Sequence, residues 1–413
     1  MGAHPVLSLL LILTLVQNGK SYNPFPVYSD EFLDILPEQP KLEQLAESDD
    51  PLEFHEGPIY FPDENGGFIL FTTQPVGNYA DPKANPLNSI RRYDIDSGNV
   101  TTFRSSTNAN MPNGQFRDPQ GRLLTCEQGF KHGSPGRITR TDVESGEIEI
   151  LINGTFGMEL NSPNDIVVKS DGTVWFTDPS YGYLQSFRPE PQVGDFVYRF
   201  DADARGPQVT IVADFFSKPN GLAFSPDEHF LYLTDSGAIQ GPGSWHPNLP
   251  HHIIRYDVID GKHLRNRQLF AVVENNVTGS ENPGIPDGIK LDQCGNVFVG
   301  AGDGVQVFNE DGDLVGKILT PTFVSNLEFG GQQGNDLFLM ANSALYKVTL
   351  NAFGAGFPRI QDCKNKPHVF AALDNSNLMN GGVSLILLFT LMFMYLTKEK
   401  RNDDERKAEK KSE

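Results

Sequence analysis

Cysteine and tryptophan are scarce in this chain, which holds three Cys and two Trp among 413 residues. Three cysteines cannot build the dense disulfide framework of a small secreted scaffold, and they leave at least one thiol unpaired. A bridge between Cys294 and Cys363 stays open as an alternative in an oxidising compartment. Cys126 lies inside an expected strand, so we interpret it as a small buried core residue rather than a nucleophile.

Several catalytic and binding motifs are also missing. No Gly-x-Ser-x-Gly sequence occurs, which argues against a serine hydrolase with a nucleophile elbow. The nine His residues form no zinc-spaced motif, since His251 and His252 are adjacent and His132 lies in a Gly-rich loop. Basic residues number 33 against 53 acidic ones, which gives a formal charge of −20. Such a field attracts cations and repels nucleic acid, so no nucleic-acid partner is expected.

Long apolar runs are confined to the two ends of the chain. Residues 6–16 have the length of a signal-peptide core, and polar residues with a plausible cleavage region near 19–21 follow them. We therefore assign residues 1–21 to a signal peptide. Three sequons, at Asn99, Asn153 and Asn276, are compatible with entry into the secretory pathway and with a glycoprotein.

Residues 378–396 approach the length that a membrane-spanning helix needs, and the basic residues Lys398, Lys400 and Arg401 follow them. This pattern predicts a single-pass membrane protein with a charged cytoplasmic tail at 397–413 and a main domain that is extracellular or lumenal. A glycolipid-anchor signal is one alternative, although its apolar tail should end the chain. A buried core helix is another. Residues 22–50 are interpreted as an acidic N-terminal segment and 366–377 as a linker.

One sequence pattern recurs between these ends. Each copy opens with Pro-Asn-Gly, Pro-Asp-Gly or a related step, continues into an apolar strand, turns, and ends in a second apolar run. A second hairpin often follows, as at 92–98 and 255–261. A period of about fifty residues that holds four short strands is typical of propeller blades. We predict an all-β fold, a six-bladed β-propeller of antiparallel four-stranded blades over residues 51–365.

The six copies begin their first strands at Glu56, Asn113, Asn164, Asn220, Asp287 and Asn326. Because the innermost strand of each blade begins at the central channel, these side chains should form one ring of oxygens at its mouth. The simpler interpretation is that Asn-Gly and Asp-Gly are turn residues that tolerate unusual backbone angles. Six converging polar groups must still be paired with each other, with water or with a cation. Their oxygens favour Ca²⁺ over Mg²⁺ or Zn²⁺, and another divalent ion is the alternative.

On these residues the chain resembles the gluconolactonase, regucalcin and diisopropyl-fluorophosphatase propellers. The resemblance covers about residues 50–350 and is carried by Glu-Gly-Pro at 56–58 and by the segments 113–127, 161–179 and 219–236. It implies a six-bladed propeller with one catalytic divalent ion, usually Ca²⁺, in the channel. The metal ligands that it implies are Glu56, Asn164 and Asp235, and Asn113 touches metal or substrate in the family.

The chain departs from the family pattern at two positions. Met111 stands where regucalcin-like members carry an Arg used on a sugar acid, and Gln128 stands where many gluconolactonases carry a His. A sugar-lactone preference that depends on that Arg is therefore not implied, and Gln128 cannot titrate in place of the His.

We expect a hydrolase of a lactone or related ester in which Ca²⁺ stabilises charge on a substrate oxygen. Asp235 is the candidate base or nucleophile, because a carboxylate can serve either role. Further candidates for substrate or metal contact are Asn113, Asn220, Asp178 and Glu127. The alternative from another class is a membrane-tethered propeller that binds a partner or calcium without catalysis.

Overall fold

The computed structural model describes residues 23–49, 53–75, 87–130, 133–204, 206, 208–241, 243–273, 285–358 and 363. The chain divides into two compact units, Met1–Gln361 and Asp362–Glu413. The fold described below lies in the first unit, and Cys363 is the one described residue of the second.

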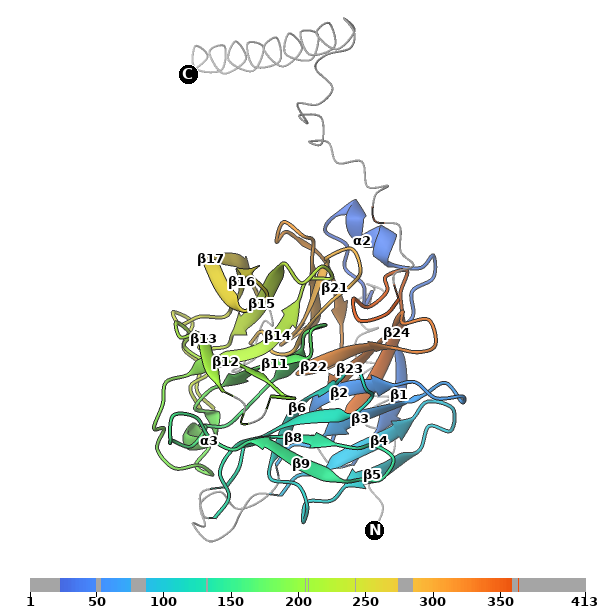
Figure 1. The fold of residues 1–413 in the computed structure, drawn as a ribbon. Helices are drawn as coiled ribbons and strands as arrows, with labels where there is room; N and C mark the ends of the chain where they lie inside the picture. Colours follow the sequence, from blue (N-terminus) through green and yellow to red (C-terminus); the bar gives the residue numbers. More distant parts are fainter. Residues whose placement is uncertain are drawn as a thin grey trace, which may run out of the picture. The chain divides into compact units, whose positions relative to one another are not determined.

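Six four-stranded antiparallel sheets make up this fold, which confirms the predicted six-bladed propeller. Figure 1 follows the sheets in chain order from blue to orange. The first three blades are β2 (Glu56–Phe61), β3 (Phe68–Thr72), β4 (Ile90–Asp94) and β5 (Val100–Arg104); β6 (Pro112–Arg117), β7 (Leu123–Glu127), β8 (Arg137–Thr141) and β9 (Ile148–Ile152); and β10 (Ile166–Val168), β11 (Thr173–Asp178), β12 (Phe196–Asp201) and β13 (Thr210–Ala213). The next two are β14 (Pro219–Phe224), β15 (Phe230–Asp235), β16 (His252–Ile259) and β17 (His263–Val272); and β18 (Ile289–Leu291), β19 (Val297–Ala301), β20 (Gly304–Phe308) and β21 (Leu314–Leu319).

The sixth blade is built from both ends of the propeller. Its three inner strands are β22 (Asn326–Gly330), β23 (Asp336–Ala341) and β24 (Ala344–Thr349), and its fourth is β1 (Glu43–Glu47), which pairs antiparallel with β24. Glu43 lies opposite Lys347 in this register, and their charged groups are 3.7 Å apart. We expected residues 22–50 to precede the propeller. The structure corrects this boundary, because the last blade takes its outer strand from this segment.

The core lies between neighbouring blades. All six residues of β11 are buried, as expected for a strand with a blade packed on each face, whereas β9 at the edge of its blade exposes Glu149 and Ile150. One cluster joins the second blade to the third, and within it Phe176 stacks on Tyr198 with ring centroids 5.3 Å apart. The apolar alternation of each hairpin therefore fixes how the blades pack.

Among the described residues no helix is long and apolar enough to cross a membrane. The predicted signal peptide at 1–21, the linker at 366–377, the transmembrane segment at 378–396 and the tail at 397–413 lie outside those residues, as does the sequon at Asn276. Asn99 and Asn153 are exposed. Cys126 is a buried free thiol, and Cys294 takes part in a disulfide bond.

The short helix α2 (Asp30–Ile35) packs on strand β21 of the fifth blade. Its Phe32 is fully buried, and a methyl group placed on Gly316 would lie 2.1 Å from the Phe32 ring. The Ser29 side chain caps the helix by accepting a hydrogen bond from the Glu31 amide. The segment before β1 is thus part of the folded domain.

Replacing Phe32 with Ala should lower the free energy of unfolding by about 3–5 kcal/mol, because it removes a buried ring and leaves a cavity. Leu33 on the same helix is 53% exposed, so Leu33→Ala serves as the control, with an expected change below about 0.5 kcal/mol. Denaturant unfolding followed by tryptophan fluorescence measures both variants. Equal losses would contradict the docking of this helix through Phe32.

Candidate active site

The residues that open the six innermost strands lie next to one another around one mouth of the channel. At least one hydrogen bond joins each pair of neighbouring blades here. These bonds include Thr72 Oγ1 to Asn113 O at 3.2 Å, Gly114 N to Asn164 O at 2.7 Å, Thr177 Oγ1 to Asn220 O at 2.8 Å, Thr234 Oγ1 to Asp287 O at 2.9 Å, Gly288 N to Ser325 O at 2.8 Å, and Asn326 Nδ2 to Glu56 Oε2 at 2.8 Å. The last bond returns to the first blade. The polar ring that the repeats predict is therefore closed.

Glycine follows most ring residues because the backbone of the next blade comes too close for a side chain. A methyl group on Gly57 would lie 2.3 Å from the Asn113 carbonyl oxygen, and one on Gly221 would lie 2.4 Å from that of Asp287. Gly57 also has a φ angle of +54°, which glycine adopts without a steric penalty. The Asn-Gly and Asp-Gly steps thus allow the innermost strands to converge.

Glu56 and Asp287 bring two carboxylates together in this ring. Glu56 is buried, and Asp287 keeps part of its surface open at the mouth. Loss of water and the nearby charge of Asp287 raise the pKa of Glu56 well above its usual range, against hydrogen bonds from Asn326 and from the Gly57 amide at 3.0 Å. Loss of water also raises the pKa of Asp287, against hydrogen bonds from Asn220 and Glu56. Two neighbouring carboxylates that have both lost water need a shared proton or a cation between them.

Amide side chains add oxygens to the same mouth. The Oδ1 atom of Asn113 is buried and has no hydrogen-bond partner among the described residues. Hydrogen bonds within the described part of the chain do not involve the Asn164 side chain. Asn220 donates through Nδ2 to Ser236 Oγ at 3.1 Å. Asn326 differs, because Nδ2 donates to Glu56 and Oδ1 accepts from the Leu327 amide at 2.8 Å, so both ends of its amide are engaged.

This donor set fits a hard cation. Carboxylate and amide oxygens with uncommitted lone pairs are the ligands that Ca²⁺ takes, and here Glu56, Asp287, Asn113, Asn164 and Asn220 supply them. The described residues hold no group of three or more His, Cys, Asp or Glu placed to bind a metal. A cation at this mouth would therefore depend on amide oxygens as much as on the two carboxylates.

Asp235 has another task in the structure than the one we expected. Its two carboxylate oxygens accept hydrogen bonds from the backbone amides of Lys218 at 2.9 Å and Ser217 at 3.0 Å, which lead into β14. Asp178 does the same one blade earlier, where it accepts from Asn161 and Ser162, both at 2.8 Å. Both carboxylates hold the entry to the innermost strand of their own blade. The geometry thus favours Asp287 over Asp235 as the carboxylate that joins Glu56.

Glu127 occupies the matching position at the end of β7, and ion pairs engage it. Its side chain is fully buried and lies 2.5 Å from Arg104 Nη2 and 2.6 Å from Arg137 Nε, and it accepts a hydrogen bond from Thr139 at 2.8 Å. Two guanidinium groups at these distances offset the loss of water around a buried carboxylate. We therefore interpret Glu127 as a structural anchor of the second blade rather than as a contact for substrate or metal.

The two residues that depart from the family pattern meet at the start of the second blade. The backbone N–H of Gln128 donates a hydrogen bond to the backbone carbonyl oxygen of Met111 at 2.8 Å, and both side chains are buried. Met111 has a φ angle of +61°, in the left-handed region that residues with a side chain rarely adopt. An apolar thioether, with no positive charge, therefore lies two residues before Asn113.

Sequence reasoning missed two further residues near the ring. Asp165 directly follows Asn164 and is buried. Its Oδ2 atom has no hydrogen-bond partner among the described residues. Burial raises the pKa of this carboxyl, and the charge of Lys290 opposes that shift. Its signal was its place in Ser-Pro-Asn-Asp, directly after a ring residue.

Tyr181 is the second missed residue, and it opens the short helix α3 (Tyr181–Leu184) just after β11. It is 7% exposed, and its hydroxyl group meets no hydrogen-bond partner in the described part of the chain. Burial first, and then the charge of Asp287, raise the pKa of this phenol well above its usual range. The Ser236 hydroxyl acts in the opposite direction, although the two hydroxyls lack hydrogen-bond geometry. The phenol thus lies close to the ring, and only its position after Thr-Asp-Pro could have indicated this.

Comparison with known proteins places this site in a family. The model of the SMP-30/Gluconolactonase/LRE-like region matches residues 86–343. A gluconolactonase of Zymomonas mobilis is 28% identical over 351 residues, which are 82% of this chain and 89% of the relative. The lactonohydrolase oryL of Aspergillus oryzae is 30% identical over 315 residues, which are 71% of this chain and 67% of the relative.

A solved structure agrees with these sequences. The gluconolactonase of Xanthomonas campestris superposes with a TM-score of 0.63 at 31% sequence identity, and the match covers 80% of this chain and 96% of that one. The family model covers most of the propeller, from the middle of the first blade to β23 of the last. The chain belongs to the SMP-30/gluconolactonase/LRE-like family.

Proposed function

We propose that this protein is a Ca²⁺-dependent lactone hydrolase that acts at the channel mouth where Glu56 and Asp287 meet. The contact between these two carboxylates carries the proposal, because the fold brings together two groups that need a cation or a proton between them. The names of the relatives, gluconolactonase and lactonohydrolase, support lactones as the substrate class.

Glu56, Asp287 and the amide oxygens of Asn164 and Asn220 would hold the ion, with Asn113 beside them for the ion or the substrate. When bound, Ca²⁺ supplies Lewis-acid stabilisation of the negative charge that builds on a lactone carbonyl oxygen. The contribution of the chain is preorganisation. The hydrogen bonds between neighbouring blades fix these donors before substrate arrives, so little rearrangement is needed during the reaction.

Asp287 is our candidate for the base or nucleophile. It is the ring carboxylate that keeps some exposure at the mouth, so it can meet water or an incoming lactone. Asp235 has both oxygens engaged by backbone amides and acts as a positioning residue for the chain that enters β14 and carries Asn220.

Calcium affinity distinguishes the role of Asp287 from that of Asp235. Asp287→Asn should weaken Ca²⁺ affinity at least about 100-fold, because it removes a charged ligand. Its melting temperature without calcium should not fall, since repulsion with Glu56 is relieved. Asp235→Asn should instead lower the melting temperature and change Ca²⁺ affinity by less than about tenfold. Isothermal titration with Ca²⁺ and thermal melts in chelator measure both quantities. The reverse pattern would return Asp235 to the ligand set.

Hydrolysis should require the metal. We expect the protein to open glucono-δ-lactone or an aliphatic lactone in a pH-indicator assay, to lose at least about 99% of this activity in chelator and to regain it with Ca²⁺. Asp287→Asn should stay inactive with Ca²⁺ present. A folded protein that binds Ca²⁺ and turns over no lactone or aryl ester would support the alternative of a propeller that binds calcium or a partner without catalysis.

Tyr181→Phe should reduce kcat/KM for a lactone by about 10- to 100-fold, because the phenol is placed to donate a hydrogen bond to the reacting oxygens. Calcium affinity and melting temperature should not change. Tyr183 on the same helix is 46% exposed, and Tyr183→Phe is the matched control with unchanged kinetics. If the two variants behave alike, Tyr181 has no part in the reaction.

A further inference from the structure

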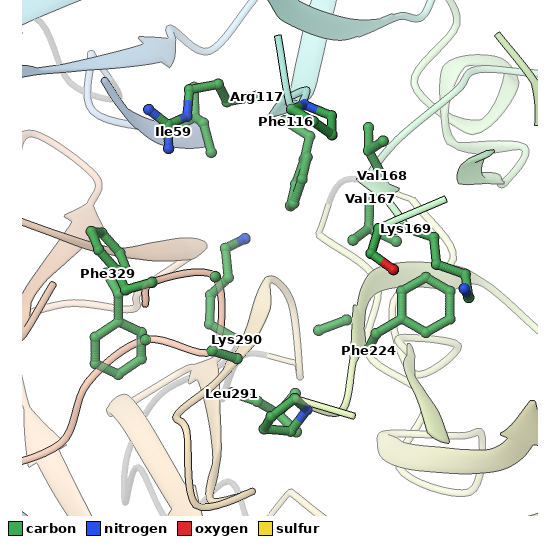
Figure 2. Close-up of a pocket in the computed structure, with 18 of the residues that line it drawn as sticks. Ile59, Phe116, Arg117, Val167, Val168, Lys169, Phe224, Lys290, Leu291 and Phe329 are labelled. Atoms are coloured by element: carbon green, nitrogen blue, oxygen red, sulfur yellow. The ribbon is translucent and has the colours of Figure 1, made fainter. Parts of the chain in front are cut away.

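The opposite mouth of the channel contains a cavity of about 900 Å³. It is lined where the innermost strands end rather than where they begin, as Figure 2 shows for the labelled side chains. Its volume falls in the range of pockets that hold small organic molecules, which is roughly 300–1,000 Å³. The lactone site proposed above does not use this cavity.

The cavity is distinct from the polar ring although the same strands form both. Ile59 lines it three residues after Glu56, and Lys290 lines it three residues after Asp287. Three residues span at most about 10 Å along a strand, so the two sites lie at different depths of one channel. A ligand at one mouth therefore need not contact the other.

Apolar side chains make up much of the wall. They come from all six blades and are Ile59, Phe116, Val167, Phe224, Leu291 and Phe329. In Figure 2 the ring of Phe116 extends into the open space between the strands. A wall of this kind favours a ligand with an apolar body, because burying that body removes it from water.

Charged residues of both signs also line the cavity, and one of the basic ones lacks an acidic partner in the ranges that the structure describes. Arg117 forms no salt bridge with any residue that the structure describes, and its guanidinium lies 5.8 Å from the centroid of the Phe61 ring. The ammonium group of Lys290 lies 3.6 Å from a Glu328 oxygen. Lys169 at the same mouth is already matched by Asp171 at 3.2 Å and Glu228 at 2.9 Å. Arg117 is thus the cation available to a ligand.

Glu328 does not cancel this charge in full. Burial raises the pKa of its carboxyl to about 7, against the opposing effects of Lys290 and Arg117. Near neutral pH a fraction of Glu328 is therefore neutral. Two further acidic residues line the cavity: Asp118 pairs with Arg122 at 2.7 Å, and Asp227 accepts a hydrogen bond from Ser225 at 2.6 Å. The guanidinium of Arg117 is the charge that these contacts leave for a ligand.

We propose that this second mouth binds a small organic carboxylate with an apolar body, with the carboxylate on Arg117 and the body against the apolar wall. A guanidinium can hold a carboxylate through two parallel hydrogen bonds, which gives orientation as well as affinity. Arg117 is at the end of β6 and Phe116 precedes it, so the charged and apolar parts of the site are adjacent in the chain.

Octanoate binding by the full chain tests this site, measured by isothermal titration in chelator so that calcium in the ring cannot attract the probe. Octanoate should bind, and octanol of the same length and gluconate without an apolar body should each bind at least about tenfold more weakly. Arg117→Met should reduce octanoate affinity at least about tenfold, and Arg117→Lys should recover part of it.

Arg199→Met is the control, because it removes one positive charge from strand β12 outside the cavity lining, and it should change affinity less than about twofold. Asp287→Asn should retain octanoate binding, which keeps this result independent of the lactonase proposal. Absence of octanoate binding, equal binding of octanol, or unchanged binding by a folded Arg117→Met protein would each overturn the second site.

Discussion

The close approach of the six innermost strands at one mouth of the channel is the constraint on which the rest of this structure depends. Gly57 and Gly221 lie where a side chain would collide with the carbonyl oxygen of the next blade. The hydroxyls of Thr72 and Thr234 then donate hydrogen bonds to the same two carbonyl oxygens across the gap. Backbone convergence of this kind places the ring side chains side by side, so the site follows from blade packing rather than from an added loop.

Convergence has an electrostatic cost that also explains the chemistry. Glu56 and Asp287 both lose water, which raises their pKa values, and the charge of Asp287 raises the pKa of Glu56 further. Fully engaged amides such as Asn326 relieve part of this cost, whereas Asn113 and Asn164 leave oxygens uncommitted. A ring whose amides and carboxylates were all hydrogen-bonded to one another would be more stable without a ligand. Its incompleteness favours a bound cation, since buried polar groups are otherwise paired.

Sequence patterns predicted the blades and the ring, because strand alternation and the Asn-Gly steps are local features that repeat. They did not distinguish Asp235 from Asp287. Both follow an apolar strand or precede one, and which carboxylate meets Glu56 depends on contacts across blades far apart in the chain. The Thr-Asp pair at the end of β15 makes two different contacts. Thr234 donates a hydrogen bond to the next blade, and Asp235 accepts one from the backbone that leads into β14 of its own blade. The role of β1 in the last blade was missed for the same reason, because ring closure joins residues about 300 positions apart.

The two mouths of the channel differ because the repeat governs only one of them. At the strand starts most blades place a glycine next to a polar residue, and this close packing leaves oxygen atoms around the axis. At the strand ends the blades diverge, and no comparable packing rule applies, so Arg117, Lys290 and Glu328 need not resemble one another. A propeller can therefore hold an oxygen-lined site and a cavity with apolar and charged walls on the same six strands. The depth between them, at most about 10 Å along a strand, allows each to take a ligand of its own.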